Sequence, residues 1–90
     1  MEARVSNSIL VNSDDAHKGK HSFFRVGGKK TSLRLEPVFW QALKEIAAQH
    51  RVYLADLVTA IDRAREDEIS LASTLRVFVV MHYRGELKYD

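Results

Sequence analysis

The stretch Lys30-Thr31-Ser32-Leu33-Arg34-Leu35-Glu36-Pro37 alternates polar and apolar side chains until a proline ends the run. Alternation with a period of two is typical of a β-strand that has one apolar and one polar face. Proline suits the first turn of a helix and cannot continue a ladder of backbone hydrogen bonds. This stretch therefore predicts a short strand over Lys30 to Leu35, followed at once by a helix.

Three helices are predicted after the strand. Pro37 to His50 carries apolar side chains at helical spacing, and Leu54 to about Ala64 does the same after a turn at Arg51 to Tyr53. Ser70 is typical of an N-cap for a third helix that runs to about Tyr83. This third helix is apolar nearly all round, and a chain of 90 residues offers little protein to cover it. We therefore expect it to contribute to a subunit interface.

The composition restricts the class of protein. The length of 90 residues suits one domain, and the absence of cysteine excludes disulfides and thiolate metal sites. Residues 1–21 are mostly polar, so we expect a flexible N-terminal arm followed by a domain over residues 22–90, where Phe23 to Val26 indicate a short extended segment that Gly27-Gly28 breaks. Neither a signal peptide nor an apolar run of about 20 residues is recognisable, which predicts a cytoplasmic protein without membrane contact.

Positive charge is concentrated in and just before the predicted strand. Residues 21–35 contain Arg25, Lys29, Lys30 and Arg34 and no acidic side chain, although the net charge of the whole chain is only +2. Such a local field suits a polyanion as partner. No nucleophile–base pair, glycine-rich phosphate loop or carboxylate pair occurs at motif spacing, so we expect neither an enzyme nor a cofactor or metal site.

The period of the strand divides its side chains between two faces. If Leu33 and Leu35 face the core, Lys30, Ser32 and Arg34 face outward, and these residue types suit base edges in the major groove of DNA. Two antiparallel copies of such a strand form a ribbon that suits a groove about 12 Å wide. The plainer alternative, which the sequence leaves open, is that Lys30 and Arg34 are edge-strand charges that discourage aggregation.

Taken in order, these segments resemble a bacterial ribbon-helix-helix family (MetJ/Arc-like), in a variant with an extra C-terminal helix. The resemblance is carried by the strand through Pro37, by Phe39-Trp40 and Leu43, by residues 54–62 and by residues 71–79. It implies a mainly α fold with one short strand, in which two chains form an intertwined homodimer with a two-stranded antiparallel β-ribbon. It also implies a sequence-specific transcription regulator, acting as a repressor, that inserts this ribbon into the major groove of double-stranded DNA.

The remaining site residues follow from this expected architecture. Phosphate contacts are expected at Arg25 and Lys29 and at Tyr53, Leu54 and Ala55, where the N–H groups and dipole at the start of the second helix favour an anion. The expected dimer core comprises Leu33, Leu35, Phe39, Leu43, Leu57, Ile61, Leu75 and Phe78.

Two residues depart from the family pattern, and two alternatives stay open. Arg51 stands where such turns carry glycine, which implies strain, and Tyr53 stands where a small hydroxyl residue caps the second helix. The alternative function is an antitoxin-like protein-interaction module that neutralises a partner protein and autoregulates its operon. Dimers could also pair into tetramers on DNA.

Overall fold

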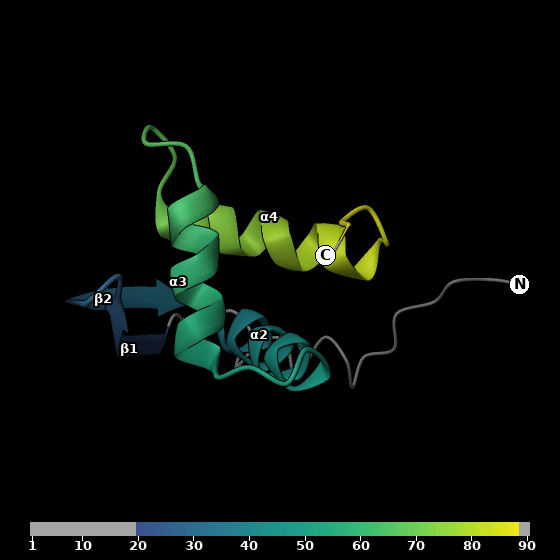
Figure 1. Ribbon diagram of the computed structural model, residues 1–90, viewed down its shortest axis with the longest axis horizontal. Helices are drawn as coiled ribbons and strands as arrows, with labels where there is room; N and C mark the ends of the chain where they lie inside the picture. Colours follow the sequence, from purple (N-terminus) through teal and green to yellow (C-terminus); the bar gives the residue numbers. More distant parts are fainter. Residues whose placement is uncertain (1–19, 89–90) are drawn as a thin grey trace, which may run out of the picture.

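The computed structural model describes residues 20–88, which form two strands followed by three helices (Figure 1). The elements are β1 (Lys20–Val26), β2 (Lys29–Leu35), α2 (Pro37–Gln49), α3 (Leu54–Ala64) and α4 (Leu71–Tyr83). This mainly helical architecture with a short antiparallel ribbon confirms the predicted fold class, and the three helices lie where the sequence predicts them. Most of the expected arm, residues 1–19, lies outside the described residues.

The two strands belong to one antiparallel hairpin, in which Val26 pairs with Lys29 and Lys20 pairs with Leu35. Gly27 and Gly28 form its turn, with φ values of 58° and 87°. A two-residue turn with positive φ at both positions is typical of type I′, whose twist matches that of the flanking strands. The expectation of one strand without a partner in its own chain is therefore wrong, because the glycine pair closes a hairpin instead of interrupting the extended chain.

The core lies where the inner face of β2 meets all three helices. In Figure 1, α3 crosses the N-terminal part of α4, and α4 contacts both α3 and β2. Four of these elements contribute side chains that are fully enclosed: Leu35 of β2, Leu43 and Ile46 of α2, Val58 of α3 and Leu75 of α4. The helices thus support the ribbon from one side, and the side chains of β2 on the other side, Lys30, Ser32 and Arg34, are exposed.

The turn between α2 and α3 is closed by two backbone hydrogen bonds around Arg51. The N–H of Arg51 donates to the carbonyl of Ala48 at 3.2 Å, and the N–H of Val52 donates to the carbonyl of Ala47 at 3.0 Å. This is the Schellman pattern, which requires a left-handed residue after the helix. Arg51 takes that conformation with a φ of 57°, so the strain predicted at this position is present.

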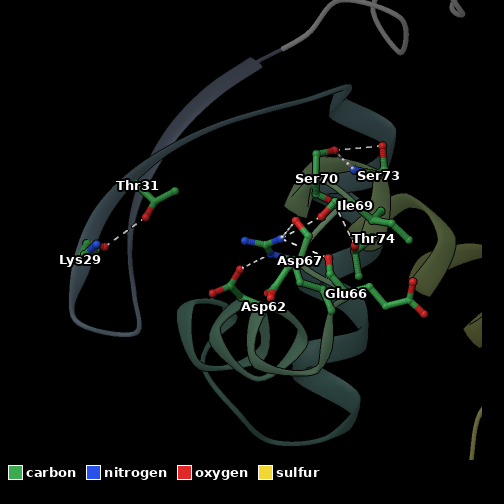
Figure 2. A network of polar contacts seen from close by, with 10 residues as sticks. Lys29, Thr31, Asp62, Glu66, Asp67, Ile69, Ser70, Ser73 and Thr74 are labelled. Carbon is green, nitrogen blue, oxygen red and sulfur yellow. Dashed lines mark hydrogen bonds and ion pairs between the residues drawn. The ribbon is translucent and has the colours of Figure 1, made fainter.

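Arg65 organises the loop that joins α3 to α4 (Figure 2). Its Nε donates to Oδ1 of Asp62 at 2.7 Å, and its Nη1 donates to the carbonyl oxygens of Glu66 at 3.3 Å and Ile69 at 2.9 Å. One guanidinium group thereby ties the end of α3 to the residue before the α4 cap. These contacts hold the angle between the two helices.

The N-terminal half of α4 is fixed by a cap and by an ion pair. The hydroxyl oxygen of Ser70 accepts a hydrogen bond from the N–H of Ser73 at 3.1 Å, as expected of an N-cap. Arg76 forms a two-pronged contact with the Glu36 carboxylate at 2.8 and 3.2 Å, and its guanidinium carbon lies 5.9 Å from the centre of the Phe39 ring. These contacts anchor α4 to the junction between β2 and α2.

Candidate nucleic-acid interface

The outward face of β2 is polar and cationic. Along β2, Lys30, Ser32 and Arg34 are exposed while Leu33 and Leu35 are buried, which is the alternation that the period of two predicts. Arg25 of β1 is exposed and shares this face because it pairs with Lys30. The hairpin therefore gathers three cations and one hydroxyl on one exposed surface, which we call the basic face (Arg25, Lys30, Ser32, Arg34).

The strand register places two cations of the basic face directly opposite each other. Arg25 and Lys30 are paired residues of neighbouring strands, so their side chains leave the sheet on the same side. Like charges at directly opposite positions destabilise a sheet. Residues 21–35 themselves contain no acidic side chain. An anion lying over this face would attract both side chains and so offset the repulsion between Arg25 and Lys30.

Lys29 belongs to the other side of the ribbon, where it pairs with buried Val26. It is nevertheless exposed because it stands next to the turn, and its carbonyl accepts a hydrogen bond from the Thr31 hydroxyl at 3.3 Å (Figure 2). The structure thus separates Lys29 from the basic face. A contact from Lys29 would reach the flank of a ligand and not the surface beneath the ribbon.

The start of α3 is exposed and carries no side-chain cap. Tyr53 occupies the N-cap position, makes no capping hydrogen bond and is 81% exposed. Leu54 and Ala55 form the first turn and are partly buried. The first N–H groups of a helix lack partners within the helix and favour an anion together with the helix dipole. This end of α3 offers the backbone groups that the sequence predicts, but no side-chain donor fixed over them.

Thr59 connects α3 to the ribbon, a role that the sequence does not reveal. Its hydroxyl oxygen lies 2.9 Å from the carbonyl of Ala55 and 3.4 Å from the carbonyl of Arg25. This contact places the helix alongside β1, so that the backbone carrying Arg25 is held by α3. Thr59 is six residues from Tyr53, and the start of α3 therefore lies about 9 Å further along the helix axis.

The residues expected in a dimer core pack inside a single chain. Leu33, Leu35, Leu43, Ile61 and Leu75 are buried, and Phe39, Leu57 and Phe78 pack against them with part of their surface exposed. The contacts of the buried members are thus accounted for without a second copy. Their contribution to a dimer stays a prediction.

The span from the start of β1 to the end of α4 corresponds to a known type of domain. The sequence model of a ribbon-helix-helix domain matches residues 19–83. The chain belongs to the ribbon-helix-helix family. Such domains generally bind DNA and dimerise. The comparison with curated proteins found no match.

Among solved structures, this ribbon-helix-helix chain is similar to an uncharacterized protein from Bordetella pertussis Tohama I, with a TM-score of 0.69. The two are 24% identical, and the similarity covers 98% of this chain and 78% of the other. At this identity the likeness shows a shared fold. Because the family match reaches residue 83, α4 is part of the family domain and not an addition outside it.

Other kinds of site find little support in the described part of this ribbon-helix-helix chain. Within residues 20–88, no three His, Asp or Glu side chains are grouped as metal ligands, and no helix is long and apolar enough to cross a membrane. One titratable group departs clearly from its usual behaviour: desolvation raises the pKa of Tyr83, and its hydrogen bond to Glu45 and the charge of that carboxylate raise it further. Tyr83 ends α4, on the far side of α3 from the ribbon (Figure 1).

Proposed function

We propose that this protein is a sequence-specific transcription regulator that binds double-stranded DNA in the cytoplasm and acts as a repressor by occupying its operator. The observation that carries the proposal is the basic face, where the register sets Arg25 against Lys30 and where Arg34 and Ser32 follow on the same side. Paired strands lie about 4.8 Å apart, so a two-stranded ribbon suits a major groove about 12 Å wide.

Each residue of the proposed interface has a chemical role. Arg34 and Lys30 donate to guanine O6 and N7, and Ser32 adapts to either a donor or an acceptor on a base edge. Arg25 and Lys29 neutralise phosphates beside the groove. The backbone N–H groups at Tyr53, Leu54 and Ala55 bind a further phosphate, which sets the angle at which the ribbon meets the DNA.

The intramolecular hairpin changes how many ribbons a homodimer presents. Because β1 and β2 come from one chain, each copy carries a complete two-stranded ribbon. Two copies related by a two-fold axis would present two basic faces, which matches an operator with two related half-sites. The proposal also includes a homodimer whose interface contains the residues expected in the dimer core. It further includes the pairing of such dimers into tetramers on DNA.

The first experiment measures base recognition with DNA selected in vitro by the purified protein. Arg34→Ala should weaken binding to the selected sequence by about 1–3 kcal/mol and relax the preference at one position in each half-site. Lys44→Ala is the matched control, because Lys44 is an exposed cation on α2, outside the basic face. If Arg34→Ala and Lys30→Ala both bind the selected DNA like the parent, the basic face has been assigned to the wrong role.

The second experiment measures the dependence of affinity on salt. Arg25 and Lys29 of two copies supply four phosphate-neutralising side chains, and each neutralised phosphate contributes about −0.9 to the slope of log affinity against log salt. A slope of roughly −4 is expected, and Lys29→Ala should reduce its magnitude by about 2. A flat salt dependence would contradict DNA binding through this segment and would favour the antitoxin-like alternative.

A further inference from the structure

An open groove of about 460 Å³, which we call the α2–α4 groove, lies between helices α2 and α4. Apolar and aromatic side chains form most of its wall: Val38, Phe39 and Ala42 from α2, and Val79 from α4. Among the described residues that line it, Glu45 is the one with a charge. A volume of this size suits a small molecule, since ligand sites typically measure about 300–1,000 Å³. The groove thus combines an apolar wall with one negative charge.

The polar end of the α2–α4 groove is the carboxylate of Glu45. The Tyr83 hydroxyl donates to its Oε1 at 3.1 Å, and Nε2 of Gln41 donates to its Oε2 at 3.2 Å. Both donors are neutral groups, so these bonds orient the carboxylate without neutralising its charge. A carboxylate accepts about four hydrogen bonds, which leaves two positions for a ligand. Because desolvation and the nearby Glu45 raise the pKa of Tyr83, the phenol keeps its proton at neutral pH and continues to donate.

We propose that the α2–α4 groove binds a small organic cation, an amine with an aromatic body. The ammonium group donates to the two remaining acceptor positions of Glu45, and such charge-assisted hydrogen bonds are stronger than neutral ones. Val38 precedes Glu45 by seven residues on α2, so it lies about 10 Å away along the helix axis. That length suits a two-ring body joined to the amine by a short link. The body would cover Val38, which is 52% exposed.

The sign of the charge in the groove selects a cation over an anion. An anion would meet the Glu45 carboxylate and, among the described lining residues, no basic side chain. The aromatic rings of Phe39 and Tyr83 also line the groove, and the faces of such rings attract cations. Phe39 already has one cationic neighbour, because the guanidinium carbon of Arg76 lies 5.9 Å from the centre of its ring. Arg76 itself forms an ion pair with Glu36 at 2.8 Å.

The α2–α4 groove is distinct from the surfaces proposed for DNA and for the dimer. The basic face lies on the ribbon, and its three cations would repel an amine. Of the described residues that line the groove, Phe39 alone also belongs to the expected dimer core. The inference therefore does not rest on DNA binding, and its test contains no DNA.

The test is isothermal titration calorimetry of the full-length protein with tryptamine, which joins an indole ring to an ammonium group through two carbons. Tryptophol is the matched probe, because it has the same ring and link with a hydroxyl group in place of the ammonium group. Tryptamine should bind at one site per chain and at least about tenfold more tightly than tryptophol. Equal affinities for the two probes, or no binding of tryptamine at millimolar concentration, would overturn the proposal.

Substitutions of exposed residues locate the site, with circular dichroism as the check on folding. Glu45→Gln keeps an acceptor for the Tyr83 hydroxyl and removes the charge, so it should weaken tryptamine binding about tenfold and leave tryptophol binding unchanged. Val38→Lys places a cation at the other end of the groove and should also weaken tryptamine binding. Glu68→Gln is the matched control, because Glu68 is an exposed acid in the loop before α4. The assignment is wrong if Glu45→Gln binds tryptamine like the parent, or if Glu68→Gln weakens binding equally.

Discussion

Replacing Arg51 by glycine should raise the free energy of unfolding by about 0.5–1 kcal/mol. Arg51 is held at a φ of 57° by the backbone hydrogen bonds that end α2. A residue with a Cβ atom costs about 1–2 kcal/mol in this conformation. Glycine removes that strain but gives the unfolded chain more conformational freedom, which offsets about 0.4–1 kcal/mol of the gain. The difference between the two effects gives the expected net stabilisation.

The measurement is thermal or urea unfolding at one fixed protein concentration, because association shifts apparent stability. For a domain of this size, the expected gain corresponds to a rise in Tm of about 2–8 °C. Arg51→Ala is the matched control, since it removes the guanidinium group and keeps the strain. Gly85 supplies the reciprocal test: it has a φ of 71° after α4, so Gly85→Ala should lower stability by about 1 kcal/mol. If Arg51→Ala is as stable as Arg51→Gly, charge and not backbone strain accounts for the gain.

Three further outcomes are expected. Ser70→Ala should lower the free energy of unfolding by about 1 kcal/mol and Ser70→Asp should not, because only the alanine removes the N-cap acceptor of α4. A double-mutant cycle with Glu36→Gln and Arg76→Gln, followed by urea unfolding, should show a coupling of about 1 kcal/mol, and additive effects would contradict it. The raised pKa of Tyr83 means that its stabilising contribution is complete below the ordinary tyrosine pKa of 10.0 and is lost as the pH rises through the folded-state value. In alkaline unfolding experiments Tyr83→Phe should remove this sensitivity, and an unchanged pH profile would count against it.

The helices could be predicted because local chemistry determines where each of them begins and ends. Pro37 is suited to a first helical turn, and Ser70 supplies a side-chain acceptor that the structure shows in use. The turn at Arg51 could also be predicted, since a helix that ends in a Schellman motif requires a left-handed residue whatever its type.

The strand pairing and the rotation of α4 could not be predicted in the same way. The Gly27-Gly28 pair is compatible with an irregular segment that ends the extended chain and with a type I′ turn. Only the type I′ turn pairs β1 with β2. In α4 nearly every position is apolar, so its pattern does not tell which side faces the core. The structure buries Leu75 and exposes Val77, and this difference identifies the core side of the helix. The contact of Thr59 with β1 has no local signal at all, because it joins segments 34 residues apart.

Two features of the fold, one electrostatic and one conformational, lie where the proposed function places a polyanion. The Arg25–Lys30 pair sets like charges opposite each other on the ribbon, and Arg51 is strained in the turn that leads into the exposed start of α3. Local costs of this kind persist where a ligand or a mechanism uses them. A phosphate backbone would offset the first by neutralising the pair, and the guanidinium of Arg51 stands within two residues of the N-cap proposed to bind a phosphate. Both features therefore have one explanation if the protein binds DNA, whereas the edge-charge alternative accounts for Lys30 and Arg34 but not for a strained arginine in the turn.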